Sequence, residues 1–142
     1  MFFIQSLISP FLLKYATYHA IIKQGGDDIR INQECIRDIL LFVESRITPS
    51  VSSTDIEELI ENLPYSEEII SYHVDLISQS KLIEVILYAD DIAVDIPDLS
   101  PLGRQYLDAI RDDTKWNKLK SSFSSFLSMS IPMALEFALS KL

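Results

Sequence analysis

The chain has 142 residues, of which 48% are hydrophobic and 23% are charged. This composition excludes a disordered chain, and the length predicts one domain that buries roughly two thirds of its unfolded surface in a core of its own. The formal net charge is −9, and residues 55–98, with twelve acidic residues and one basic residue, carry the acidic excess.

The first 22 residues include 15 apolar ones, interrupted by a proline and by polar residues. The uninterrupted runs fall short of the ~20 apolar residues that span a bilayer, so we expect no transmembrane helix. We also expect no secretory signal, because no positive charge precedes the apolar run and no convincing small-residue cleavage site follows it. The spacing of aromatic and aliphatic residues predicts a helix over residues 11–23, within an N-terminal helical extension over residues 1–30.

Three helices are predicted between residues 32 and 80. Asn32 is a suitable N-cap for a helix through about Arg46, in which apolar residues recur every three or four positions. Thr54 and Glu57 have the spacing of a capping box, which predicts that a short helix begins there. Ser66 is the expected N-cap of a further helix through about residue 80.

The hydrophobic pattern changes period after residue 81. Residues 82–87 are rich in β-branched and aliphatic side chains, and apolar residues alternate along residues 92–96. This pattern predicts two short antiparallel strands joined by a turn at residues 88–91.

Three helices are expected after the second strand. Ser100 as N-cap and Pro101 at the first helical position predict a helix with an inward side of Leu102, Tyr106, Leu107 and Ile110. Another helix is predicted from about Thr114, with Trp116, Leu119, Phe123 and Phe126 inward, and a last one from Pro132.

The order of these elements is that of a winged helix, in which a helix-turn-helix is backed by a β-hairpin. We therefore predict a mainly α (α+β) fold: a winged helix-turn-helix with a two-stranded β-hairpin and extra N- and C-terminal helices. The winged-helix core would cover residues 31–113, and residues 114–142 would form a C-terminal helical segment packing on it. Residues 66–80 would occupy the position of a recognition helix, with residues 88–91 at the tip of the wing.

Three blocks of sequence resemble a known family. They are residues 65–73 (YSEEIISYH), 81–84 (KLIE) and 99–118 (LSPLGRQYLDAIRDDTKWNK). The chain resembles, over residues 34–142, an uncharacterised domain-of-unknown-function family of bacterial phages and mobile elements. The resemblance implies a winged-helix-like fold and a mobile-element setting, and it implies no activity.

The charge of the expected recognition helix argues against DNA binding. Duplex DNA attracts proteins mainly through Lys and Arg that neutralise its phosphates. The predicted recognition helix has no basic residue before Lys81, whereas residues 99–142 carry six bases and four acids. A DNA-binding winged-helix transcriptional regulator therefore remains the alternative interpretation, with its surface at Arg104, Arg111, Lys115, Lys118 and Lys120.

The acidic residues suit a protein partner better. A surface of this charge attracts a basic protein and resembles nucleic acid to a protein that handles it. Simple solubility is the competing explanation for the same acids. The predicted partner-binding residues are Glu57, Glu58, Glu61, Glu67, Glu68, Asp75, Asp90 and Asp91.

We expect no catalytic, cofactor or metal site. Zinc sites draw on several Cys or His ligands, and this chain has Cys35, His19 and His73 alone. Three glycines cannot build a phosphate-binding loop, and the acids near residue 90 lack the spacing of a calcium loop. His73 and Cys35 are expected in or near the core, and Gly103 is expected to permit close packing.

Two further residues have a structural interpretation. Asp113 is expected to cap the helix that begins at Thr114, while Trp116 anchors that helix to the core. A ligand site formed by Asp112, Asp113, Trp116 and Asn117 is the alternative.

Both ends of the chain are apolar, so the apolar faces of the predicted terminal helices must pack against another surface. Packing within the chain is the first expectation, a homodimer through the terminal helices the second, and membrane attachment the last, because a Lys/Arg-rich polar face is lacking. The lone Cys35 favours a reduced compartment, the cytoplasm. Together these observations predict a non-enzymatic protein-binding or regulatory module of a phage or mobile element, whose acidic face engages host nucleic-acid-handling machinery.

Overall fold

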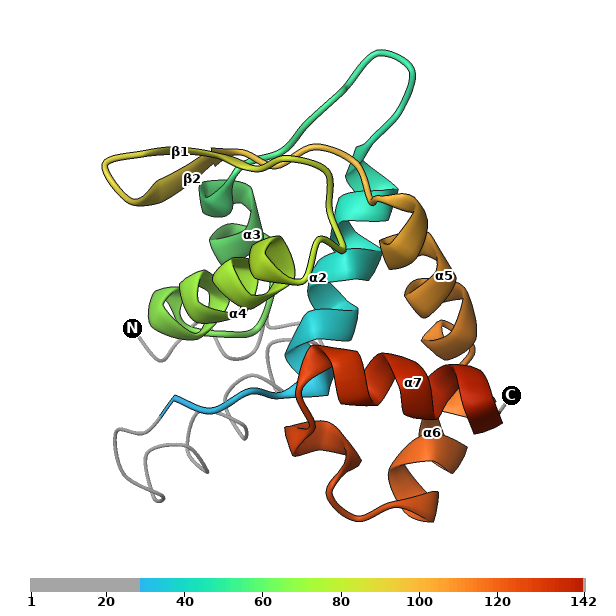
Figure 1. Cartoon of the computed structure of the whole chain (residues 1–142). Coiled ribbons are helices and arrows are strands. Elements are labelled where there is room, and N and C mark those ends of the chain that lie inside the picture. Colours follow the sequence, from blue (N-terminus) through green and yellow to red (C-terminus); the bar gives the residue numbers. More distant parts are fainter. Residues whose placement is uncertain (1–28, 142) are drawn as a thin grey trace, which may run out of the picture.

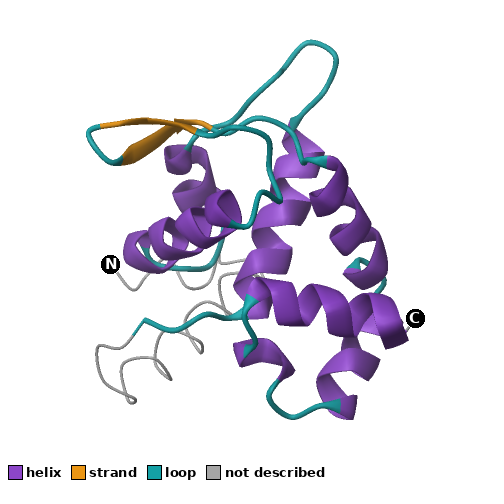
Figure 2. Cartoon of the chain, viewed as in Figure 1, coloured by secondary structure: helices purple, strands orange, loops and turns teal. Residues whose placement is uncertain are grey.

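A computed structural model describes residues 29–141 of the chain. The predicted helix over residues 11–23 and most of the predicted N-terminal extension lie outside the described residues. The described part is mainly helical with one two-stranded antiparallel hairpin, which confirms the α+β class (Figure 2).

Helix α2 (Gln33–Arg46) lies at the centre of the fold, with α4 on one side and α5 on the other (Figure 1). Its N-cap is Asn32, as predicted: the Asn32 Oδ1 accepts a hydrogen bond of 2.7 Å from the Glu34 N–H. The helix is buried along much of its length because its apolar residues recur on more than one side, at Cys35, Ile36, Ile39, Leu40 and Val43.

Helices α3 (Ile56–Asn62) and α4 (Glu67–Gln79) pack against each other. Ser66 caps α4 as predicted, through a 3.3 Å bond from the Ile69 N–H to its Oγ. The predicted cap of α3 is wrong by one residue: Asp55 accepts from the Glu58 N–H. Thr54 cannot cap the helix in the expected way because its backbone pairs with that of Ile96.

Two residues after α4 ends, the chain adopts the left-handed conformation. Lys81 has φ of 59°, its N–H donates to the Ser78 carbonyl, and the Leu82 N–H donates to the Ile77 carbonyl at 3.1 Å. This geometry is a C-terminal cap that glycine usually occupies, because a Cβ is strained there. The turn redirects the chain toward the hairpin.

The hairpin consists of β1 (Leu87–Ala89) and β2 (Ile92–Asp95). Asp90 and Asp91 connect the strands with positive φ, as a two-residue type I′ turn requires. The predicted strand over residues 82–87 is wrong in position, because the chain at its start makes separate backbone pairs with residues 98 and 99 instead of a continuous ladder.

A pair of backbone bonds holds the hairpin over α3. The Thr54 N–H donates to the Ile96 carbonyl at 2.8 Å, and the Ile96 N–H donates back at 2.7 Å. Strand β2 contacts both α3 and α4, so the hairpin covers one end of this helix pair (Figure 1).

Helix α5 (Pro101–Ile110) begins in close contact with the end of α4. The Ser100 Oγ accepts from the Gly103 N–H at 3.0 Å and donates to the Lys81 carbonyl at 2.6 Å. A Cβ at Gly103 would lie 1.8 Å from the Leu82 carbonyl oxygen, so glycine permits this close approach as predicted. Leu102, predicted inward, is exposed because it lies on the outer side of the first turn.

The chain ends with α6 (Asp113–Ser122), the short 3₁₀ helix η2 (Phe126–Ser128) and α7 (Ile131–Lys141), which packs against α5. Trp116 is buried, as predicted, and Phe126 packs on it edge to face at 5.4 Å. Phe123, predicted inward, is 43% exposed because α6 has ended before it and the chain is extended there.

The predicted cap of α6 is also wrong by one residue. Asp112 is the N-cap, accepting from the Lys115 N–H at 3.0 Å. Asp113 instead accepts from the Arg37 guanidinium at 2.9 Å, because the buried Arg37 reaches the start of α6 and also bonds two carbonyls at the end of α5.

We expect Gly103→Ala to lower the free energy of unfolding by about 2 kcal/mol or more, because the new methyl group would overlap backbone atoms that cannot move independently. Urea unfolding followed by circular dichroism measures the change. Gln105→Ala, at an exposed position of the same helix, is the matched control and should have little effect. Coincident unfolding midpoints for Gly103→Ala and the wild type would contradict the close approach.

We expect Lys81→Gly to raise the free energy of unfolding by about 0.5–1 kcal/mol, because glycine adopts positive φ without strain. Ser80→Gly, one residue earlier and in right-handed conformation, should lower it. Thermal and urea unfolding of the two variants give the comparison. A Lys81→Gly protein no more stable than the wild type would show that the left-handed turn carries no strain.

Candidate functional site

A groove lies where α3, α4 and the hairpin meet. Its volume is about 160 Å³. Apolar residues from all three elements contribute to its lining: Ile56, Ile60, Val74, Ile92 and Ala93. The groove exists because β2 crosses α3 and α4 and leaves a hollow between them.

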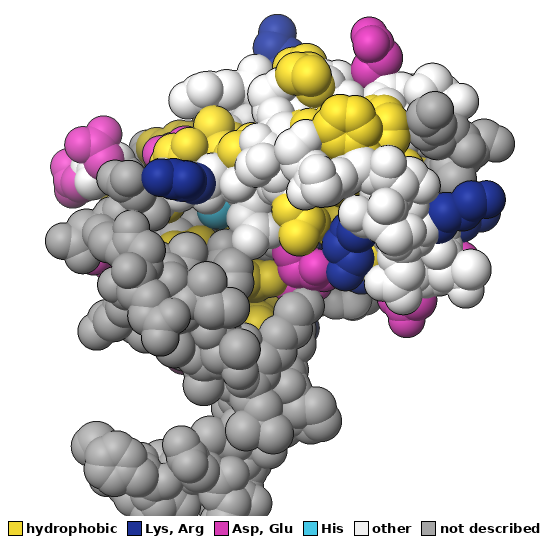
Figure 3. Space-filling model, turned by 90° about the horizontal axis from the view of Figure 1, so that it is seen from below, with side chains coloured by type: hydrophobic (Ala, Val, Ile, Leu, Met, Phe, Trp, Pro, Cys, Tyr) yellow, Lys and Arg dark blue, Asp and Glu magenta, His cyan; other side chains and the backbone are white. Residues whose placement is uncertain are grey.

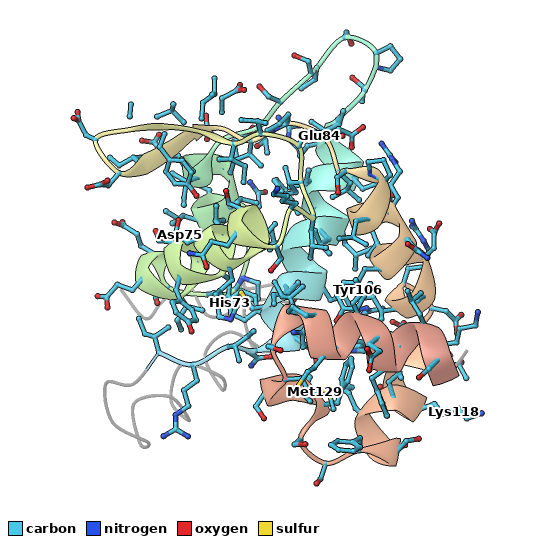
Figure 4. All side chains as sticks on the ribbon, viewed as in Figure 1. His73, Asp75, Glu84, Tyr106, Lys118 and Met129 are labelled. Atoms are coloured by element: carbon cyan, nitrogen blue, oxygen red, sulfur yellow. The ribbon has the colours of Figure 1, made fainter. Side chains whose placement is uncertain are left out.

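Four acidic side chains line the same groove. Glu57 belongs to α3, Glu67 and Asp75 to α4, and Asp91 to the turn of the hairpin. Asp75 is labelled on α4 in Figure 4. All four side chains are exposed, and within the described residues none of them forms an ion pair with Lys or Arg. The fold therefore brings half of the eight predicted partner-binding acids to one place.

Tyr88 joins the hairpin to one of these acids. Its hydroxyl donates to the Asp75 Oδ1 at 2.8 Å. Partial burial, and then the nearby Asp75 carboxylate, raise the pKa of Tyr88, so the hydroxyl stays protonated and can donate this bond. The second carboxylate oxygen of Asp75 makes no hydrogen bond within the described residues.

The other four predicted acids lie elsewhere. Glu61, Glu68 and Asp90 are exposed and do not line the groove. Glu58 has a structural role: it accepts a hydrogen bond from the Thr54 hydroxyl and an ion pair of 2.6 Å from Arg46. These two interactions, the Thr54 bond first, hold the pKa of Glu58 below its usual value.

The basic residues of the alternative DNA-binding surface are largely paired with acids. Arg111 makes a two-pronged contact with Glu44 at 2.8 Å, and these hydrogen bonds lower the pKa of Glu44. Arg104 pairs with Asp98, and Lys120 with Glu34. Figure 3, which views the molecule from below, shows the Lys and Arg side chains as separate spots.

Two of those five bases, Lys115 and Lys118, make no ion pair within the described part of the chain. Both are exposed on α6, and Figure 4 shows Lys118 on the outer side of the molecule. A pair of lysines is a small footprint compared with the several phosphate contacts that non-specific DNA binding uses.

His73 is a buried structural residue. Its Nε2 accepts the Asn32 N–H at 2.9 Å, and its Nδ1 donates to the Ile69 carbonyl at 2.7 Å. The ring is thus neutral with its proton on Nδ1, and burial lowers the pKa of His73. Cys35 is fully buried, as expected.

Trp116 also has a structural role, because its contacts join α6 to α2. The indole N–H donates to Glu34 at 3.1 Å, and Arg37 and Lys120 lie over the ring at 5.1 and 5.5 Å. These contacts hold α6 against α2. Asn117, in the same stretch of sequence, is exposed.

The sequence did not predict the apolar outer side of the hairpin. Val85 is 78% exposed and Leu87 55% exposed, and Ile92 and Val94 are also exposed. Ile92 and Val94 alternate along β2 with Ala93, which is buried, and β2 contacts α3 and α4. Ile92 is about half exposed and also lines the groove.

The described residues contain neither a membrane-spanning helix nor a cluster of metal ligands. None of their helices is long and apolar enough to cross a membrane. No group of three or more His, Cys, Asp or Glu within residues 29–141 is arranged to hold a metal ion.

This mainly helical domain belongs to the family described as hypothetical protein (DUF2513), which matches residues 30–130. The chain is 34% identical over 101 residues to an uncharacterised protein of Haemophilus influenzae, an alignment that covers 66% of this chain and 78% of that protein. No solved structure matches the chain. The range matched by the family contains every residue that lines the groove.

We expect the stability of the wild-type protein to fall as the pH drops below about 6.5. His73 binds a proton there in the unfolded chain but not in the folded one, because burial lowers its pKa in the folded state. A histidine whose pKa is lowered by folding adds to the free energy of unfolding at pH values above its pKa in the unfolded chain, and this addition is lost as the pH falls below that pKa. His73→Leu should remove this part of the pH dependence in urea unfolding between pH 5 and 7.5.

His19→Gln is the control for the other histidine of the chain and should keep the wild-type dependence. An NMR titration of the wild type gives a second measurement. An imidazole pKa of His73 at or above 6.5 would contradict a buried, neutral ring.

Proposed function

We propose that this chain is a winged-helix domain that binds a basic protein through the groove between α3, α4 and the hairpin, and that it has no enzymatic activity. The proposed setting is the cytoplasm of a bacterium that carries a phage or mobile element. The proposed partner is a host protein that handles nucleic acid and therefore has a basic surface.

The order of elements supports the winged-helix assignment. Helices α2, α3 and α4 precede a two-stranded hairpin and a further helix, α5. In a winged helix of this order α4 is the recognition helix and the hairpin is the wing. The resemblance of residues 34–142 to an uncharacterised family of phages and mobile elements supports the proposed setting.

The observation that carries the binding proposal is the charge of that surface. Four exposed carboxylates, from Glu57, Glu67, Asp75 and Asp91, line the groove without a basic partner among the described residues. Phosphates would be repelled there, whereas Lys and Arg of a protein would be attracted. Three of the five bases that could favour DNA are instead held by ion pairs to acids.

A short fluorescein-labelled peptide of mixed Arg, Lys and Leu tests the proposal by fluorescence anisotropy. We expect the wild type to bind it, with affinity that falls as salt is added. Glu57→Lys combined with Glu67→Lys, at two positions that line the groove, should weaken binding by about tenfold, because two attractions of up to about 1 kcal/mol each become repulsions.

The control is Glu84→Lys combined with Glu136→Lys, which changes the net charge by the same amount away from the groove and should bind nearly as the wild type does. Equal weakening by both double variants would reduce the effect to net charge and would overturn the proposal. A wild type that binds duplex DNA of arbitrary sequence more tightly than the peptide would favour the transcriptional-regulator alternative.

A further inference from the structure

We propose that the groove is the binding site for one arginine side chain of the partner, which an extended basic segment presents. This inference rests on the proposed function. The groove has an apolar lining and an acidic rim, and its volume of about 160 Å³ suits a single side chain and not a helix. The occupant must therefore be long, apolar along its stem and positive at its tip.

The apolar lining decides against a small hydrated cation. Ile56 and Ile60 come from α3, Val74 from α4, and Ile92 from β2, so the walls of the hollow offer aliphatic contact. A hydrated ion gains nothing from such walls, whereas the methylene stem of Arg or Lys covers apolar surface while its charged head stays near water.

The arrangement of the acids favours arginine over lysine. Asp75 and Glu67 lie on α4, Glu57 lies on α3 across the groove, and Asp91 lies on the hairpin turn. A guanidinium presents five N–H donors in a planar fork and can donate to more than one carboxylate at once, whereas an ammonium is a compact, strongly hydrated point charge. Charges contributed by three separate elements suit the fork.

Tyr88 orients the Asp75 carboxylate, one of the hydrogen-bond acceptors that line the groove. Its hydroxyl donates to the Asp75 Oδ1 and so holds the carboxylate in place on the hairpin side of α4, while Oδ2 remains available. Tyr88 itself lines the groove, and a tyrosine ring can stack on a guanidinium plane. A site with part of its geometry already held loses less entropy on binding.

Three peptides that differ at one position test the inference with the unaltered protein. The peptides carry Arg, Lys or citrulline at the centre of one basic sequence, and citrulline keeps the shape of arginine without its charge. We expect the Arg peptide to bind at least fivefold more tightly than the Lys peptide and at least tenfold more tightly than the citrulline peptide. Equal affinities for the three peptides would overturn the inference.

A second arm fills the groove without changing the charge of the protein. Ser71 lines the groove on α4, so Ser71→Phe should weaken binding of the Arg peptide by about tenfold and remove the preference for Arg over Lys. Gln79→Phe, at an exposed position of the same helix outside the groove, should bind as the wild type does.

The two levels of the proposal fail in different ways. If Ser71→Phe keeps full affinity and the preference for Arg while Glu57→Lys with Glu67→Lys loses binding, the acidic surface binds the peptide but the groove does not hold an arginine, and this inference is wrong. If the wild type binds none of the basic peptides, the proposed function fails together with the inference.

Discussion

The close contact between the end of α4 and the start of α5 determines where the hairpin lies. The Ser100 N–H and the Leu82 carbonyl are bonded at 3.0 Å, and Gly103 approaches that same carbonyl so closely that no other residue fits. This contact closes a loop that contains both strands, because residues 83–99 begin and end at it. The bonds between Thr54 and Ile96 then direct the closed loop over α3. The groove follows from these two constraints, because together they place the hairpin against the helix pair.

The acidic groove and the basic surface of α5 and α6 differ more in how their charges are paired than in how many charges each carries. Arg104, Arg111 and Lys120 all form ion pairs with acids, and Arg46 pairs with Glu58. Acids in the groove have no such neighbours among the described residues, so their charge acts outward. Because exposed ion pairs contribute little to stability, the consequence of this arrangement is mainly for the field of the protein and for the partners that it attracts.

Buried polar contacts orient the helices around α2. Gln33 is fully buried, and it accepts from the Tyr106 hydroxyl at 2.6 Å while donating to the Met129 carbonyl at 2.9 Å, which joins α2, α5 and the segment before α7 (Figure 4). His73 similarly joins α4 to the start of α2. Each of these groups loses a partner if a helix rotates or slides, and a buried polar group without a partner is costly. The polar network therefore selects one packing among those that the apolar residues alone would permit.

The sequence by itself determined the helices, their order and most of their caps, because helical spacing of apolar residues and capping by Asn32, Ser66 and Ser100 are local properties. It also predicted the burial of Trp116 and His73 and the close packing at Gly103. Contacts between distant segments decided the rest. Thr54 does not cap α3 as predicted, because its backbone pairs with Ile96. Asp113 does not cap α6, and it accepts a hydrogen bond from Arg37, 76 residues away in the chain. Which four of the eight acids share the groove depends on how the hairpin crosses α3 and α4, and no local pattern encodes that crossing.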